Sequence, residues 1–504
     1  MNNEIRVRFA PSPTGPLHIG GVRTALYNYL FAKHNNGTFI IRIEDTDQTR
    51  FVDGAEKYIL DALAWCGMTP DEATEIGGAY GPYTQSKRRE IYKTHIDQLI
   101  TKGHAYYAFD TAQEIEAKRE EQKTLGNLNW QYDASTRGSM RNSLTLNNIT
   151  TLELLDSGYP YTIRANIIPG ETIYFEDIIR GGVSVQSDIL DDKVLYKSDG
   201  LPTYHFANIV DDHLMKISHV IRGEEWLPST ALHTLLYSYF GWEKPKFAHL
   251  PLILKPDGKG KLSKRDGDQM GFPVFPLNWT TTNGDVFAGF REQGYLPEAF
   301  INMLALLGWN PGTEQEIIGL DELIQLFSLE KVNKSGARFD PDKTKWFQQQ
   351  YVKNSSNLAL LKQIEHRLPK NEYDQAQLEK IVELLKERIV FPQDILTQGI
   401  YFFEEPKFYD EKTVSKKWNN TSSDILQKFS LKLKDLNNFK AAQIEATFHE
   451  FLENEELGLG QVMPILRLAL TGVGSGPQIF EIAEILGNKT VYERIQQAIN
   501  SINA

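Results

Sequence analysis

The chain has 504 residues, of which 41% are hydrophobic and 24% charged, and these proportions argue against the disordered, fibrous and membrane-spanning classes of protein. At about 150 residues per domain, this length predicts three or four domains. The formal net charge is −12 and the one cysteine is Cys66, so the chain as a whole repels polyanions and has neither an intramolecular disulfide nor a multi-cysteine zinc site.

The N-terminal residues show no targeting segment. Residues 1–7 have neither the apolar core of a signal peptide nor the Arg- and Ser-rich composition of a transit peptide. No apolar run in the chain approaches the ~20 residues of a membrane span. We therefore expect a cytoplasmic protein without a membrane partner.

The first predicted elements are a strand, a loop and a helix. Residues 5–10 alternate apolar residues with arginine, and the breaker-rich run 11–16 separates them from a helical pattern. Apolar residues between 25 and 30 recur at helical spacing, and the helix is expected to end near 34–37, where Asn and Gly suit a C-cap.

A second strand at 38–43 leads into an acidic group, residues 44–47. Strand, helix and strand form the unit of a parallel, doubly wound sheet, whose ligands lie beyond the carboxyl ends of the strands. Arg8 and Glu44 fall at or near such ends. The sequence therefore predicts an α/β, Rossmann-type, doubly wound parallel sheet with a ligand site at this edge.

The sheet pattern is interrupted between about 88 and 200. Helical stretches at 90–102 and 112–123 and short strand-like pieces such as 161–164 fill this interval, which we interpret as an insertion. The sheet pattern resumes at 201–207 and continues through 220–222. The expected division is a first half of the sheet domain at 1–87, a connective insertion at 88–200, a second half at 201–258, a region at 259–343 that contains the KLSKR loop, and a helical region at 344–504.

The C-terminal region is predicted to be wholly helical. One apolar face shows at i, i+4, i+7 and i+11 in Leu378, Val382, Leu385 and Ile389. The glycine-rich segment 472–477 does not follow a predicted strand, so we interpret it as a turn between helices rather than as a phosphate-binding loop.

Two segments carry residues suited to a nucleotide. His18, Gly20 and Gly21 stand where the first loop becomes a helix, a place where free backbone N–H groups and the helix dipole favour phosphate. Taken alone, such a segment is more often an ordinary capped helix start. Basic residues gather at 243–265, and there the ordinary interpretation is a solvated loop. They are Lys244, Lys246, Lys255, Lys259, Lys261, Lys264 and Arg265.

Together these segments resemble the two nucleotide signatures of class I aminoacyl-tRNA synthetases. The surrounding sequence is more specific and resembles the bacterial glutamyl-tRNA synthetase family. The similar segments are RFAPSPTG at 8–15, RIEDTD at 42–47, YHFAN at 204–208, VIRGEEW at 220–226 and LSKRDG at 262–267. A weaker similarity at 466–472, LRLALTG, extends the resemblance over essentially the whole chain.

The resemblance implies a glutamate site. Arg8, Tyr204 and Arg222 would surround the carboxylates of L-glutamate, and Glu44 would take its ammonium group. The pocket would be completed by Ser12 and Asn208. A guanidinium holds a carboxylate through two parallel charge-assisted bonds, whereas a glutamine amide would turn a donor toward a donor, so glutamate is expected to be preferred.

The resemblance also implies an ATP site and a two-step reaction. His18 and Lys264 would be catalytic and would stabilise charge on the α-phosphate, with support from Lys261, Gly20 and Gly21. Glu225 would hold the ribose. ATP would enter with Mg²⁺, the glutamate α-carboxylate would attack the α-phosphorus, and the 2′-hydroxyl of the terminal adenosine of tRNA(Glu) would then take the glutamyl group. The helical region would bind the anticodon, and a monomer is the default expectation.

The resemblance makes some metal sites less plausible. Some glutamyl enzymes have a cysteine-containing zinc site in the insertion, but residues 103–109 contain no cysteine, so no structural zinc is expected. Asp45 and Asp47 lack a wider set of ligands and are expected to cap or to form ion pairs, so no metal site is assigned to protein side chains.

Other interpretations remain open at this stage. Glutaminyl-tRNA synthetases share the catalytic architecture, but they usually end in β-barrels rather than helices. A short tRNA-modifying relative lacks an anticodon domain. A nucleotide-dependent ligase of a small molecule would need no RNA, and a non-catalytic RNA-binding protein would not need the residues just named.

Overall fold

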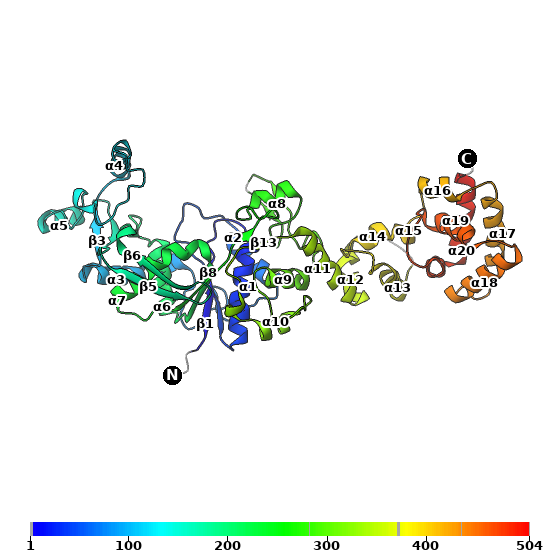
Figure 1. Ribbon diagram of the computed structural model, residues 1–504, viewed down its shortest axis with the longest axis horizontal. Helices are drawn as coiled ribbons and strands as arrows, with labels where there is room; N and C mark the ends of the chain where they lie inside the picture. The colour runs from blue at the N-terminus through cyan, green and yellow to red at the C-terminus, as the bar shows by residue number, and fades with distance from the viewer. Residues whose placement is uncertain (1–3, 282, 370–372, 435, 503–504) are drawn as a thin grey trace. The chain divides into compact units, whose positions relative to one another are not determined.

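The computed structural model describes residues 4–281, 283–369, 373–434 and 436–502, except for the side chains of residues 264, 265 and 268. These residues fall into two compact units (Figure 1). The first unit comprises Met1–Gln293 with Pro297–Thr344, and the second comprises Gly294–Leu296 with Lys345–Ala504. None of the described helices is long and apolar enough to cross a membrane.

The first unit is built around a mostly parallel sheet. Four strands pair in the order β6 (Gly181–Gln186), β5 (Thr172–Asp177), β9 (Lys246–Leu250) and β8 (His219–Gly223). The pair β1 (Arg6–Phe9) and β2 (Thr38–Ile41) continues this arrangement, with β1 in contact with β8. β1 lies beside β8: the N–H of Ser218, the residue before β8, donates to the Arg6 carbonyl at 2.9 Å. Only β6 runs antiparallel to its neighbour. The predicted parallel α/β sheet is confirmed.

Helices follow the strands of this sheet. α1 packs against β1, β2 and β8, and α7 packs against β5. Every residue of β1 is buried, as expected for a central strand covered on both faces. α1 ends at His34, and Asn36 has a φ of 51°, which confirms the predicted helix end. The helices of this part are α1 (Ile19–His34), α2 (Ala55–Trp65), α6 (Tyr204–Leu214) and α7 (Thr230–Phe240).

Residues 88–200 form a group of elements with its own small sheet. β3, β4 and β7 pair in antiparallel fashion, and side chains such as Tyr106 and Trp130 form a separate apolar cluster. β3, α4 and α5 lie together in cyan in Figure 1. The elements are α3 (Arg89–Thr101), β3 (Ala105–Ala108), α4 (Ala112–Thr124), α5 (Asn148–Asp156), β4 (Thr162–Ala165) and β7 (Val194–Tyr196).

This interval also supplies two strands of the main sheet. β5 and β6 lie within 88–200, yet β5 pairs with β9 through Asp177 and Phe247. The periodicity of the sequence did not predict this, because a strand pattern does not identify the sheet to which the strand belongs. The division of the first unit into smaller domains stays a prediction.

Short elements complete the first unit. β10 pairs with β13 in parallel, and β11 pairs with β12 in antiparallel fashion. The elements are β10 (Ile253–Leu254), α8 (Lys264–Met270), β11 (Trp279–Thr280), β12 (Val286–Phe287), α9 (Pro297–Leu306), α10 (Leu320–Leu326) and β13 (Ala337–Arg338).

The secondary structure in the described residues of the second unit consists of helices joined by loops, which confirms the prediction for the C-terminal region. Val382, Leu385 and Ile389 are fully buried, as the apolar periodicity predicted. The segment 472–477 is the predicted turn between α19 and α20. After α11 (Pro341–Asn354), whose residues divide between the units, the helices are α12 (Asn357–Ile364), α13 (Gln375–Leu385), α14 (Asp394–Gln398), α15 (Ile400–Phe403), α16 (Glu411–Lys417), α17 (Ser422–Lys434), α18 (Ala441–Asn454), α19 (Leu459–Thr471) and α20 (Ile479–Ile502).

Candidate active site

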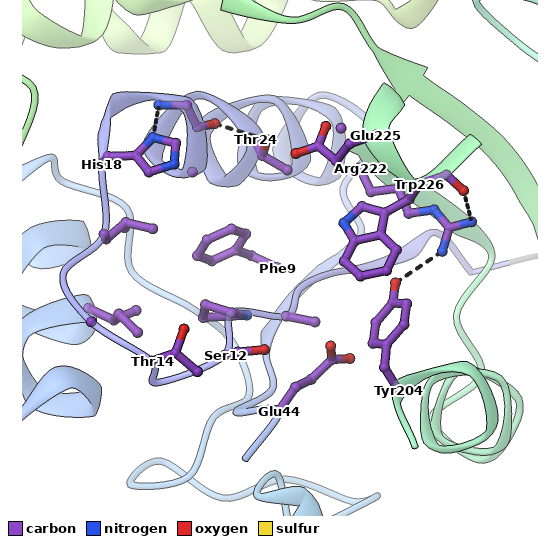
Figure 2. Close-up of a pocket in the computed structure, with 18 of the residues that line it drawn as sticks. Phe9, Ser12, Thr14, His18, Thr24, Glu44, Tyr204, Arg222, Glu225 and Trp226 are labelled. Carbon is purple, nitrogen blue, oxygen red and sulfur yellow. Dashed lines mark hydrogen bonds between the residues drawn. The ribbon is translucent and has the colours of Figure 1, made fainter. Parts of the chain in front are cut away.

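A pocket of about 890 Å³ opens at the carboxyl ends of β1 and β8 (Figure 2). Ten of the residues predicted to bind a ligand line this pocket: Arg8, Ser12, His18, Gly20, Gly21, Glu44, Tyr204, Arg222, Glu225 and Lys261. Residues separated by more than 200 positions in sequence thus meet at the edge where an open α/β sheet binds its ligands. Of the other two predicted residues, Asn208 does not line the pocket, and the side chain of Lys264 lies outside the described part of the structure.

His18 begins α1 at one end of the pocket. Its Nδ1 accepts a hydrogen bond from the Gly20 backbone N–H at 3.0 Å, so the imidazole caps the helix. An acceptor Nδ1 places the proton of the neutral ring on Nε2. His18 therefore combines a structural bond at one nitrogen with a donor at the other, beside the N-terminus of a helix, where an anion is favoured.

The two glycines after His18 stand in a closely packed turn. A Cβ atom on Gly21 would lie 2.4 Å from Leu17 Cδ1, and one on Gly20 would lie 2.8 Å from His18 Cε1. Both positions line the pocket, so side chains here would crowd the turn where a ligand approaches the backbone.

Glu225 and Lys261 form an exposed ion pair across the pocket. Lys261 Nζ lies 3.0 Å from Glu225 Oε1. Burial opposes ionisation of Glu225, but a backbone N–H and Lys261 outweigh it and hold the pKa of this carboxyl below its usual range. The Glu225 carboxylate also lies where a Cβ on Gly223 would stand, so a side chain at 223 would require this carboxylate to move.

Arg8 is held from behind by two side chains of α6. Its Nε donates to Asp212 Oδ1 at 3.0 Å, and its Nη2 donates to Asp212 Oδ2 at 3.2 Å and to Asn208 Oδ1 at 3.3 Å. Burial would lower the pKa of Arg8, but the charge of Asp212 raises it. Asn208 is buried and acts on the pocket through Arg8 rather than by lining it.

Glu44 belongs to the same buried network. Arg42, which is fully buried, donates to Glu44 Oε1 at 3.0 Å and to Asp212 Oδ1 at 2.7 Å. Asp212 therefore accepts from both arginines. Burial raises the pKa of Glu44 to about 6, and the nearby guanidinium groups only partly oppose this effect.

Arg222 lies at the other end of the pocket from His18 (Figure 2). Its Nη1 donates to Tyr204 Oη at 3.1 Å, its Nη2 donates to Thr230 Oγ1 at 2.9 Å, and its Nε donates to His249 Nε2 at 3.0 Å. The Tyr204 ring packs on Trp226 with centroids 4.2 Å apart. These three hydrogen bonds fix the guanidinium beside a partly aromatic wall.

Three polar residues of α6 support both arginines. Tyr204, Asn208 and Asp212 are spaced by four residues, so they lie on one face of this helix. Tyr204 contacts Arg222, while the other two contact Arg8. Asp212 was not predicted; the signal for it is an acidic pair, 211–212, that is buried in this helix.

Known proteins resemble the chain over its whole length. The family model described as tRNA synthetases class I (E and Q), catalytic domain, matches residues 4–346, and an anticodon binding domain matches 356–499. A glutamate–tRNA ligase from Christiangramia forsetii is 52% identical and covers 100% of both chains. One from Parabacteroides distasonis is 54% identical over 98% of each. The chain belongs to the glutamate–tRNA ligase family.

A solved structure agrees with this assignment. The crystal structure of a glutamate tRNA ligase from Elizabethkingia meningosepticum, in complex with its amino acid, is 51% identical, has a TM-score of 0.96, and covers 99% of this chain and 100% of that chain. The predicted class I fold, with its helical C-terminal anticodon domain, is confirmed. The roles of the individual site residues stay predictions.

The second family signature lies at the start of α8. Ser263 and Asp266 form a capping box, with the Ser263 N–H donating to Asp266 Oδ2 at 2.8 Å. Lys264 is the first residue of this helix, and its side chain lies outside the described part of the structure. The basic segment is partly neutralised by local acids, since Lys255 pairs with Asp266 at 2.7 Å.

Acidic side chains near the pocket act as caps and ion-pair partners. Asp45 Oδ1 accepts from the Ser86 N–H at 2.8 Å, and Asp47 pairs with Arg50 at 2.6 Å. These are the capping and ion-pairing roles that the sequence predicted for the two residues. Within the described residues, no three His, Cys, Asp or Glu side chains form a group that could hold a metal ion. The expectation of no structural zinc stays a prediction.

Proposed function

We propose that this chain attaches L-glutamate to tRNA(Glu) in two steps. The glutamate α-carboxylate attacks the α-phosphorus of ATP, which forms glutamyl-adenylate and releases pyrophosphate. The 2′-hydroxyl of the terminal tRNA adenosine then attacks the glutamyl carbonyl and releases AMP. The observation that carries this proposal is one pocket that combines arginines, a carboxylate and a helix N-terminus in a chain half identical to glutamate–tRNA ligases.

The glutamate would occupy the end of the pocket near Tyr204 and Arg222. We assign its side-chain carboxylate to Arg222, because this end is the one away from His18, where the reacting α-carboxylate must meet ATP. Arg8 and Ser12 would assist, and Glu44 would hold the ammonium group. A glutamine amide would present N–H groups to the Arg222 donors, and such a mismatch supports a discrimination of about 10⁴.

The ATP would occupy the end of the pocket near His18. The His18 Nε2–H, the backbone at Gly20 and Gly21, and the ammonium groups of Lys261 and Lys264 would meet the phosphates, and Glu225 would meet the ribose. Catalysis would consist of positioning and charge stabilisation, without a protein nucleophile. Mg²⁺ would enter as the counter-ion of the ATP phosphates.

The remaining assignments follow from this activity. The helical unit would bind the tRNA anticodon, and the protein would work in the cytoplasm, where translation consumes its product. We propose a monomer, with its domains divided near residues 87, 200, 258 and 343 as the sequence predicts.

ATP–pyrophosphate exchange tests the proposal. The purified protein should exchange label with glutamate, and glutamine should support far less exchange, each being tested with and without total tRNA. Exchange with glutamine alone would identify the rival glutaminyl activity. A lack of exchange under every condition would refute the ligase assignment.

The pKa of Glu44 predicts how glutamate use depends on pH. Only the ionised carboxylate pairs with an ammonium group, and burial raises the pKa of Glu44 to about 6. The kcat/KM for glutamate should therefore be constant above that pH and fall about tenfold per unit below it, since this parameter reports the free enzyme. Glu44→Gln should lower kcat/KM and remove the inflection. A profile that keeps its inflection in the variant would assign the titration to another group.

A further inference from the structure

Arg8 and Arg222 are compensated in different ways. Arg8 forms a direct ion pair with Asp212, with 3.0 Å between Nε and Oδ1. Arg222 makes hydrogen bonds to imidazole, hydroxyl and carbonyl groups, and no Asp or Glu of the described residues forms an ion pair with it within 4.0 Å. The guanidinium that faces the end of the pocket thus keeps a positive charge that no adjacent carboxylate cancels.

The carboxylate of Asp177 nevertheless lies on the far side of the His249 ring from Arg222. His249 stands opposite Arg222 in the register of β8 and β9, and Asp177 ends β5, the next strand. His249 Nδ1 lies 2.6 Å from Asp177 Oδ2, and His249 Nε2 lies 3.0 Å from Arg222 Nε. The three side chains therefore form a row across the sheet, with the imidazole between the two charges.

The hydrogen bonds determine the tautomer of His249. A carboxylate can only accept, so Nδ1 carries the proton, and Nε2 has the lone pair that accepts from Arg222. Asp177 is itself fixed, since its Oδ1 accepts from the Ile179 and Arg180 N–H groups at 3.0 and 2.8 Å. Burial lowers the pKa of His249 even beside Asp177, which keeps the ring neutral.

We propose that Asp177 and His249 are positioning residues for glutamate selection: the imidazole spaces the Asp177 counter-charge away from Arg222, which leaves the guanidinium oriented and its positive charge available to the side-chain carboxylate of the substrate. This inference rests on the proposed function. A carboxylate in direct contact would compete with the substrate for the same N–H groups, whereas a neutral acceptor holds Nε and leaves the charge unsatisfied.

Asp177→Asn tests the tautomer. An asparagine keeps the oxygen that accepts from the Arg180 N–H, but its amide can donate to His249 Nδ1 and move the ring proton to Nε2, where it would face the Arg222 Nε–H. The KM for glutamate should rise about 10- to 100-fold, the size of a lost hydrogen bond to a charged group. The KM for ATP should change less than about twofold, and the ratio of kcat/KM for glutamate over glutamine should fall.

The double variant Asp177→Asn/His249→Gln separates positioning from structure. A glutamine can present its carbonyl oxygen to Arg222 Nε whatever stands at 177, so it should restore most of the glutamate selectivity that the single variant loses. Asp192→Asn is the matched control, because Asp192 is fully buried and pairs with Arg137 at 3.0 Å, away from the pocket lining. It should leave the glutamate-to-glutamine ratio unchanged.

Two outcomes would overturn the inference. A glutamate KM that is unchanged in Asp177→Asn is one, and a double variant no better than the single one is the other. If the variants do not fold, ¹⁵N NMR of the wild-type protein can identify the tautomer of His249. A proton on Nε2 would contradict the proposed hydrogen bond from Arg222 to this nitrogen. Failure of the proposed function would instead appear as wild-type protein without glutamate-dependent exchange.

Discussion

Lys264→Ala should lower the rate of glutamate-dependent pyrophosphate exchange by about 100- to 1,000-fold, the usual effect of removing one preorganised donor from developing charge. Lys264 begins α8, after a serine whose capping box with Asp266 does not involve the lysine. The fold should therefore be intact, with an unchanged thermal unfolding midpoint. The rate should be measured at saturating ATP, so that weaker ATP binding does not imitate a slower chemical step.

Lys259→Ala is the matched control for this prediction. Lys259 carries the same charge in the same basic segment, but it is exposed and does not line the pocket. If the loss at Lys264 came only from a weaker general attraction of polyphosphate, both variants would lose activity to a similar degree. Full activity in the Lys264→Ala variant would remove the lysine from the catalytic assignment.

His18→Asn should also lower the exchange rate by about 100- to 1,000-fold, while stability is preserved. The asparagine oxygen can accept from the Gly20 N–H as His18 Nδ1 does, but the variant has no group in place of Nε2–H. His18→Ala should lose the same activity and, in addition, about 1 kcal/mol of stability with the lost cap.

The pair of variants separates the two roles of the ring. Thermal unfolding of the three proteins measures the cap, and pyrophosphate exchange measures the donor. If His18→Asn were as active as the wild type, His18 would be a capping residue only, and the phosphate would be held by the backbone and the lysines.

The sequence was informative where local pattern and chemistry coincide. Arg8 could be predicted because it stands one residue before the end of a buried strand, a position that topology turns toward the ligand edge. Arg222 has the corresponding place on β8, but its role was predicted from the resemblance to the family. Glu44 follows the next strand by the same logic. The helical second unit was predictable from periodicity alone, because its helices bury simple apolar stripes.

The supports of these residues were not predictable. Arg8 bonds to Asp212, 204 positions away, and Arg222 bonds to His249 on another strand. For an acid within a helix, or a histidine within a strand, the local sequence does not identify the side chain that it will contact. Such pairs depend on which strands become neighbours, and the order β6, β5, β9, β8 is not contained in the spacing of apolar residues.

The row of polar residues on α6 sets a fixed distance within the site. Tyr204 and Asp212 are eight residues apart, which in an α-helix is about 12 Å along the axis. An α-helix hardly stretches, so the anchors of Arg222 and Arg8 keep a constant separation. α6 therefore fixes the distance between the two anchors, and we expect a dicarboxylic amino acid shorter by one methylene to fall short of Arg222 when its α-carboxylate lies at the ATP end of the pocket.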